Sequence, residues 1–287
     1  MEKIVQKIYE GERSLYAAQG LSIESCIFRN GESPLKESRD IELSGCIFEW
    51  KYPLWYSEGI SVTDSTLLVS ARSGIWYTDG IKMKNCTVDA PKTFRRSSNI
   101  SLEGCTMPFA QETLWSCRNV SLKNVSAAGD YFGMNCKDVY ADGLSLSGNY
   151  AFDGCENVVI KNSRLISKDA LWNAKNVTVE NSVIIGEYIG WNSENVTLIN
   201  CTVESNQGFC YMEGLTLVGC KLIATDLAFE YATVDAEVLT EIESVKNPIS
   251  GRIRAKGIGE IILDERFVDP SKTEIATEAD AGRELLI

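Results

Sequence analysis

The chain has 287 residues, a formal net charge of -12, ten cysteines and no histidine. The absence of histidine excludes Ser-His and Cys-His nucleophile pairs, an imidazole general base and the usual zinc and iron ligand sets. The negative charge disfavours nucleic acid or an anionic membrane as the main partner. We therefore expect no metal, no cofactor, no nucleic acid and no membrane partner.

Membrane insertion and secretion are disfavoured by the distribution of apolar residues. No apolar run approaches the roughly 18 residues that are needed to span a bilayer. The N-terminal segment, residues 1–7, lacks the apolar core of a signal peptide. The expected location is cytoplasmic.

One short phrase recurs along the chain: a small polar residue, two apolar residues separated by one position, an Asn or Gly corner, and then Cys or Ser. A clear copy runs from Asn157 to Ser163. The first apolar residues of successive copies stand 19 to 21 positions apart, at Leu21, Ile41, Ile60, Ile81, Ile100, Val120, Val139, Val158, Val177, Val196 and Leu215. So regular a period indicates a solenoid.

Each unit of the repeat predicts three short strands. The first alternates in parity, with Ile41 and Leu43 facing inward and Glu42 and Ser44 facing outward. Asn, Asp or Gly corners tolerate the left-handed backbone of the tight turn that follows. A second strand follows the Cys position, and a third is marked by aromatic residues. The predicted fold is all-β, a single-stranded right-handed parallel β-helix of about 11 to 13 coils.

The repeat also predicts the domain organisation. We expect one domain over residues 1–287, with an N-terminal cap at 1–19 and regular coils at 20–233. Residues 234–263 would form C-terminal coils or a cap, and residues 264–287 an acidic tail. Caps are expected because open strand edges recruit other chains.

Most cysteines fall into two columns of the repeat, alternating with Ser, Thr and Ala. One column holds Cys26, Cys46, Cys86, Cys105, Cys201 and Cys220, and the other holds Cys117, Cys136 and Cys155. Free Cys behaves as a small hydrophobe, so stacking inside a narrow coil accounts for both columns. There is no C-x-x-C pair that would indicate metal or redox chemistry.

A column of aromatic residues marks the third strand: Trp55, Trp76, Phe94, Trp115, Phe132, Phe152, Trp172, Trp191 and Phe229. The residue after each is often polar, and burying those polar residues would be costly. Parity therefore favours aromatics that face the core, which would expose Leu54, Ile75, Leu114 and Leu171. The alternative is an outward aromatic stripe that stacks on sugars.

Several phrases carry a resemblance to a known family: GESPLKES at 31–38, EWKYPLWY at 49–56, APKTFRR at 90–96, SKDALWN at 167–173 and GEYIGWNS at 186–193. With these phrases, residues 8–262 resemble a bacterial family of uncharacterised proteins, known only as a domain of unknown function, with a pectin-lyase-like β-helix fold. The resemblance implies this fold. It implies no activity and no catalytic residues, because fold alone does not determine function.

Charged residues that change from coil to coil precede the aromatic strand. Asp169 and Glu187 occupy nearly the same place in adjacent coils, so their carboxyl groups could approach to about 5 Å, as in retaining glycoside hydrolases. Asp130 and Asp153 form a second candidate pair, also one coil apart. Closely spaced carboxylates would raise one pKa and create a general acid. Lys168 could instead neutralise the first pair, and a solvated ladder of charge is the simpler interpretation.

The earlier coils carry a basic patch. Lys51, Arg72, Lys92 and Arg95 could contact the oxygens of an anionic sugar, and Tyr188 and Trp191 offer ring faces to substrate. An Arg or Lys could also act as the base in β-elimination. A lyase is the weaker hypothesis, because no carboxylate cage for calcium is evident. Counter-ions for the acidic residues remain the structural explanation of this patch.

Two functions stay open at this point. The first is a carbohydrate-binding or carbohydrate-processing protein, with a groove and carboxylate acid/base residues like those of glycoside hydrolases. The second is a non-enzymatic scaffold that binds another protein or a copy of itself, forming a homo-oligomer. It would present the apolar stripe of Leu54, Ile75, Leu114 and Leu171.

Overall fold

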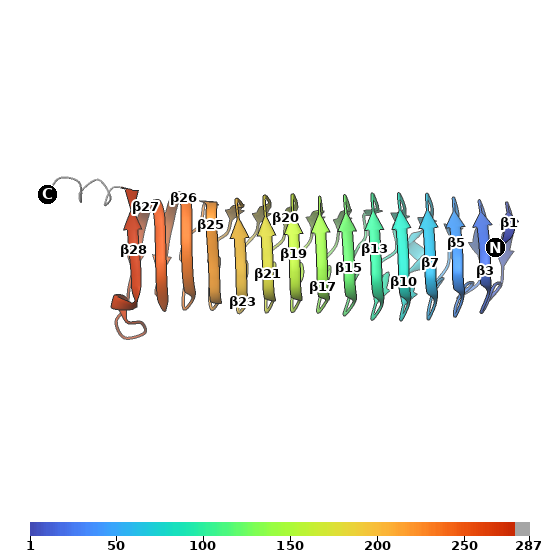
Figure 1. Ribbon diagram of the computed structural model, residues 1–287, viewed down its shortest axis with the longest axis horizontal. Helices are drawn as coiled ribbons and strands as arrows, with labels where there is room; N and C mark the ends of the chain where they lie inside the picture. The colour runs from blue at the N-terminus through green and yellow to red at the C-terminus, as the bar shows by residue number, and fades with distance from the viewer. Residues whose placement is uncertain (279–287) are drawn as a thin grey trace. The chain divides into compact units, whose positions relative to one another are not determined.

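The computed structural model describes residues 1–278, and their regular secondary structure is almost entirely β-strand (Figure 1). The chain forms two compact units, Met1–Gly148 and a second unit that begins at Asn149. Each is described by itself below. Among residues 1–278, no helix is long and apolar enough to cross a membrane.

Unit 1 is a stack of coils in which each long strand pairs in parallel with the long strand of the next coil (Figure 1). The long strands are β1 (Glu2–Val5), β3 (Gln19–Glu24), β5 (Arg39–Ser44), β7 (Glu58–Thr63), β10 (Asp79–Lys84), β13 (Ser98–Glu103), β15 (Arg118–Lys123) and β17 (Lys137–Asp142). A second row of short strands contains β2 (Ile8–Glu10), β4 (Ile27–Arg29), β6 (Ile47–Phe48), β8 (Thr66–Leu67), β11 (Thr87–Val88), β14 (Thr106–Met107), β16 (Ser126–Ala128) and β18 (Ser145–Ser147). A third row is limited to β9 (Ile75–Trp76) and β12 (Phe94–Arg95), with the 3-10 turn η1 (Val69–Ala71) before β9.

Unit 2 repeats the same plan. Its long strands, again paired in parallel, are β19 (Glu156–Lys161), β21 (Lys175–Glu180), β23 (Glu194–Ile199), β25 (Glu213–Ile223), β26 (Thr233–Lys246), β27 (Ser250–Ile262) and β28 (Thr273–Thr277). Short strands form the second row, at β20 (Arg164–Ile166), β22 (Val183–Ile185) and β24 (Thr202–Glu204). A 3-10 turn, η2 (Pro270–Lys272), precedes β28.

The predicted fold, a right-handed parallel β-helix, is confirmed, but its coils number more than the 11 to 13 expected. Residues 1–19, expected as a cap, contain β1 and β2, which pair in register with β3 and β4. Part of the expected acidic tail forms η2 and β28, which pairs with β27. The rest of that tail, 279–287, lies outside the described residues.

The core follows the predicted alternation. In β5, Ile41 and Leu43 are buried while Glu42 and Ser44 are exposed. All ten cysteines are free and buried, as the column argument predicted. The Cys46 thiol donates to the carbonyl oxygen of Ile23 at 3.5 Å. Small weakly polar side chains thus fill the narrow corner of the coil.

For the tryptophans of the aromatic column, the parity argument predicted the wrong side-chain direction. Phe94 pairs with Ile75 and Arg95 pairs with Trp76, so the phenylalanines stand one place earlier than the tryptophans. Phe94 and Ile75 are fully buried, whereas Trp76 is half-buried on the outer side. The sequence column had merged two neighbouring positions that point in opposite directions.

The apolar residues that precede each tryptophan are accordingly core residues. Leu54, Ile75, Leu114 and Leu171 are all 1% exposed or less. The expected exposed stripe therefore does not exist.

Substitution tests this reversal of parity. Leu114→Ala should lower the free energy of unfolding by about 2–5 kcal/mol, because it removes a fully buried side chain. Phe109→Ala, at a residue that is 57% exposed, should change it by no more than about 0.5 kcal/mol. Urea unfolding of the two variants measures the difference. Equal effects would contradict the buried placement of Leu114.

Candidate functional site

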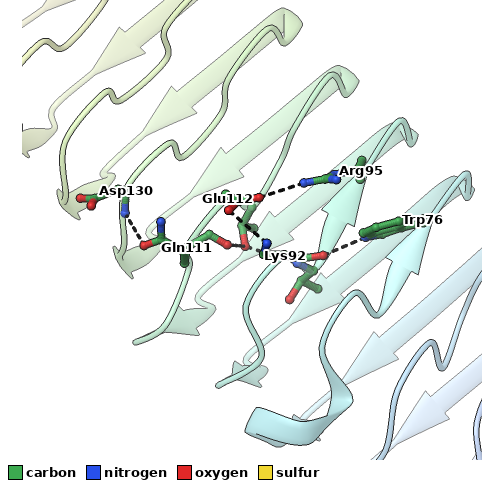
Figure 2. Close-up of polar contacts among 8 residues, drawn as sticks. Trp76, Lys92, Arg95, Gln111, Glu112 and Asp130 are labelled. Carbon is green, nitrogen blue, oxygen red and sulfur yellow. Dashed lines mark hydrogen bonds and ion pairs between the residues drawn. The ribbon is translucent and has the colours of Figure 1, made fainter.

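In unit 1, the basic residues that the sequence singled out are mostly paired with carboxylates. Lys51 lies 3.0 Å from Glu32. Lys92 and Arg95 lie 3.1 Å from the two carboxylate oxygens of Glu112, as Figure 2 shows. These cations are therefore counter-ions within the repeat, and their charge is not free for an anionic ligand.

Arg95 is further held by aromatic rings. Its guanidinium carbon lies 4.7 Å from the ring centroid of Trp76 and 4.8 Å from that of Trp115. Such a cation–π sandwich is favourable for a desolvated arginine. Arg72, in contrast, is exposed and has no ion-pair partner among residues 1–278.

The remaining unit 1 candidate, Asp130, lies on the loop one coil beyond Gln111. Its backbone N–H donates to Oε1 of Gln111 at 3.3 Å, as Figure 2 shows. Asp130 belongs to unit 1 and Asp153 to unit 2, so the predicted pair is divided between units that are described separately. Its catalytic role stays a prediction.

The outer rings of unit 1 cover one another. Trp55 and Trp76 are stacked at 5.1 Å with planes 9° apart, and Tyr56 and Tyr77 at 4.9 Å with planes 7° apart. The indole N–H of Trp76 donates to the carbonyl oxygen of Lys92 at 2.8 Å. Because neighbouring rings occupy each other's faces, this ladder is structural.

Unit 2 places its candidate residues on the equivalent loops. The backbone N–H of Asp169 donates to the carbonyl oxygen of Glu187 at 2.9 Å, and that of Tyr150 donates to Lys168 at 2.9 Å. Tyr150, Asp169 and Tyr188 therefore hold equivalent places in three successive coils, all with left-handed φ near 57°. Asp169 is an aspartate in a column of tyrosines.

A glycine fixes the loop that carries Glu187 and Tyr188. A Cβ atom on Gly186 would lie 2.1 Å from the carbonyl oxygen of Ser167 in the adjacent coil. No side chain fits at that distance, so only glycine allows the loop to approach so closely. Gly186 therefore allows the close packing of the two adjacent loops that carry Asp169 and Tyr188.

Asp169 is the most unusual carboxylate of the candidate site. It is 1% exposed, and its Oδ1 atom has no hydrogen-bond partner. Burial raises the pKa of Asp169, while Lys168 and a hydrogen bond with Tyr150 act in the opposite direction. A buried, incompletely satisfied acid lowers stability, which is typical of functional positions.

Glu187 has a different environment. Its Oε2 lies 3.1 Å from Nζ of Lys168, and both side chains are about half exposed. The Lys168 ammonium also lies 5.0 Å from the ring centroid of Tyr188. Glu187 and Asp169 thus lie in adjacent coils that are joined by a backbone hydrogen bond. The Glu187 side chain forms a solvated ion pair, whereas the Asp169 side chain is buried.

Asp153 ends a short line of amide side chains. Asn192 donates to Asn173 at 2.7 Å, and Asn173 donates to Oδ1 of Asp153 at 3.1 Å. Burial raises the pKa of Asp153, and the Asn173 hydrogen bond acts against that shift. Asp153 is half-buried, so it is the candidate acid that a ligand can reach.

The rings of unit 2 form a surface that we call the aromatic loop face: Trp172, Tyr188, Trp191, Tyr211 and Tyr231. Trp172 and Trp191 are 5.9 Å apart and tilted by 57°, and Trp191 and Tyr211 are 5.1 Å apart and tilted by 59°. Tyr188 meets Trp191 edge-on at 5.1 Å. At these tilts Trp191 does not stack face to face with its neighbours, in contrast to Trp55 and Trp76 in unit 1, whereas Trp172 stacks on Tyr150 at 6.4 Å.

The sequence reasoning missed part of this surface. Lys246, from β26, lies 2.9 Å from Oε1 of Glu230 beside Tyr231. No periodic signal could have placed Lys246 there, because β26 departs from the repeat through a bulge. The Asn173 and Asn192 line was detectable, since each residue directly follows a tryptophan of the column.

Two further features do not coincide with the predicted site. A shallow hollow of about 590 Å³ is lined by residues 265–271, and no predicted site residue lines it. Within residues 1–278, no group of three or more His, Cys, Asp or Glu side chains is placed to hold a metal ion.

The parallel strands in register and their outward loops define a right-handed parallel β-helix protein. Residues 2–276 match the family described as "Protein of unknown function (DUF3737)", and the chain belongs to this family. The predicted family resemblance is thereby confirmed. No curated protein sequence matches the chain.

Several solved structures are similar to the chain. Tailspike protein 3 of bacteriophage CBA120 is 9% identical, over 96% of this chain and 56% of that chain, with a TM-score of 0.41. The A-module of a mannuronan C-5 epimerase from Azotobacter vinelandii is 7% identical, over 96% and 88%, with a TM-score of 0.34. PfbA, a surface adhesin of Streptococcus pneumoniae, is 10% identical, over 90% and 75%, with a TM-score of 0.34. The chain spans about half the length of the tailspike protein, and these likenesses concern the fold alone.

The raised pKa of Asp169 predicts a pH dependence of stability. The folded chain holds the Asp169 proton at pH values where the unfolded chain, with an ordinary value of 3.8, has released it. Stability of the wild type therefore falls as pH rises from about 3.8 through the folded-state pKa, and then levels off. Asp169→Asn removes this fall, so the variant should gain on the order of 1 kcal/mol relative to the wild type. Urea unfolding between pH 4 and 7 measures the gap, and parallel curves would contradict the prediction.

Proposed function

We propose that the protein binds carbohydrate through the aromatic loop face of unit 2. The observation that carries this proposal is the tilt of the Trp191 ring by 57° against Trp172 and by 59° against Tyr211, because rings at such angles do not stack face to face. Tyr and Trp rings offer flat apolar faces with a polar edge, the surface that stacks on a sugar ring. In unit 1, by contrast, Trp55 stacks on Trp76 at 9° and Tyr56 stacks on Tyr77 at 7°, and the tilt between Trp115 and Tyr131 is smaller, at 31°.

The polar groups beside the rings suit sugar hydroxyls. The line formed by Asp153, Asn173 and Asn192 presents carboxylate and amide groups, which can accept from and donate to hydroxyl groups. The predicted anionic sugar is less well supported. Lys51, Lys92 and Arg95 are each engaged by a carboxylate, and Arg72 alone would have to supply the charge.

Glycoside hydrolysis is the second candidate function. It is favoured by two aspartates, Asp153 and Asp169, whose pKa values are raised by burial and whose charges interact. A hydrolase needs both carboxyl groups to reach the glycosidic bond. Asp169 is 1% exposed, so it does not meet this requirement, and we favour carbohydrate binding over hydrolysis as the function. In a hydrolase, Asp153 would be the acid within reach of substrate.

The scaffold hypothesis has lost its main support. Leu54, Ile75, Leu114 and Leu171, which it expected at the surface, are buried. Self-association and a cytoplasmic location stay predictions that the observations above do not address.

Binding can be tested with two matched tyrosine variants. Tyr211→Ala removes a ring that is 45% exposed on the aromatic loop face, and Tyr77→Ala removes a ring that is 38% exposed in the stacked ladder of unit 1. Against a panel of oligosaccharides followed by calorimetry, Tyr211→Ala should weaken binding at least about fivefold, given a stacking contribution of about 1 kcal/mol. Tyr77→Ala should leave affinity unchanged. An equal loss in both variants, or no binding by the wild type, would overturn the proposal.

Hydrolysis is tested separately, on any oligosaccharide that binds. If Asp153 is the general acid, Asp153→Asn should lower turnover by about 10²- to 10⁴-fold while the oligosaccharide still binds. Glu213→Gln, which removes an exposed carboxylate of β25 away from these loops, is the control and should retain turnover. Product release can be followed by reducing-end assay. Turnover that survives in Asp153→Asn would remove Asp153 from the mechanism.

A further inference from the structure

The aromatic loop face carries an excess of negative charge. Its loops, residues 149–154, 167–173, 186–192, 205–211 and 224–231, contain five carboxylates: Asp153, Asp169, Glu187, Asp226 and Glu230. Two of these are neutralised, since Lys168 pairs with Glu187 and Lys246 pairs with Glu230. The other three form no ion pair among the described residues, although the charge of Lys168 acts on Asp169.

Two of the unpaired carboxylates are also incompletely hydrogen-bonded. The Oδ1 atoms of Asp169 and Asp226 are buried and accept no hydrogen bond. A buried carboxylate without a partner is costly, and its field acts over a longer range because little water screens it. A positive group at the surface of these loops would reduce the free-energy cost of burying these carboxylates.

One ring of the aromatic loop face already accepts a cation. The ammonium group of Lys168 lies over the ring of Tyr188, 5.0 Å from its centroid. Trp172, whose ring face is the stronger attractor of cations, lies in the coil next to Asp153, since Gly154 N–H donates to the Trp172 carbonyl at 2.8 Å. An indole face and a reachable carboxylate are therefore adjacent.

We propose that the sugar bound by the aromatic loop face carries a free amine, so that its class is an amino sugar such as an oligomer of glucosamine. This inference rests on the proposed carbohydrate binding. The protonated amine lies over the Trp172 ring beside Asp153, and Asp169 adds its field from below. An oligomer of a uronic acid would instead meet three carboxylates that form no ion pair, and an N-acetylated oligomer would lack the charge that they attract.

Three oligosaccharides of equal length test the inference: tetramers of glucosamine, N-acetylglucosamine and galacturonate. We expect calorimetry at low ionic strength to show the glucosamine tetramer binding about tenfold more tightly than the acetylated tetramer, and the galacturonate tetramer binding most weakly. Salt should weaken the first interaction more than the second, because charge pairing at a partly exposed site is screened.

Variants locate the effect. Asp153→Asn should reduce affinity for the glucosamine tetramer about tenfold and leave the acetylated tetramer unaffected. Glu213→Gln is the matched control, because it removes an exposed carboxylate of β25 outside the aromatic loop face, and it should change neither affinity.

The outcomes separate this inference from the proposal on which it rests. Equal or tighter binding of the acetylated or galacturonate tetramer overturns the amine inference and leaves carbohydrate binding in place. Binding of none of the three, or of any sugar in the wider panel, overturns both. A glucosamine preference that survives in Asp153→Asn overturns the position assigned to the amine.

Discussion

Within each unit, the described coils are held to one another by parallel hydrogen bonds between residues that stand one repeat apart in the sequence. In unit 2, Val177 pairs with Val196 and Val196 pairs with Leu215. Because the pairing is in register, equivalent side chains of neighbouring coils are brought into contact along each row. A residue must therefore be compatible with its equivalents in the coils on both sides, and this constraint governs both the core and the surface.

Most polar and aromatic residues are explained by this constraint. Asn195 donates to Asn176, Lys175 pairs with Glu194, and Tyr56 stacks on Tyr77. Each of these contacts joins equivalent positions of adjacent coils and satisfies groups that the fold places at the surface. Stacked aromatic rings and charged pairs would suggest a functional site in a protein without repeats. Here they are the ordinary contacts between neighbouring coils.

The same constraint explains what the sequence could predict. Period and parity predicted the first two strands of the coils, the buried cysteines and the fold, because these depend on equivalent positions repeating. The third strand, predicted in every unit of the repeat, is formed only by β9 and β12 among the described residues. The tryptophan direction was missed because Phe94 and Trp76, though one position apart in register, fell into one column when the spacing was counted. Side-chain environments such as the burial of Asp169 could not be predicted from the sequence, because they depend on how Tyr150 and Tyr188 are placed in the neighbouring coils.

The aromatic loop face arises where equivalents fail to match. Trp55 and Trp76 are equivalent and nearly coplanar in stacking. Trp191 has Trp172 on one side, but its equivalent in the following coil is Cys210, reached through the bond from Asn192 N–H to the Cys210 carbonyl at 3.3 Å. A continuous stack cannot form across that small side chain, so Trp191 tilts against Tyr188 and Tyr211 instead. The interruption of the repeat therefore leaves Trp191 without a ring stacked face to face on it, and an aspartate in a tyrosine column places a buried carboxyl group on a neighbouring loop.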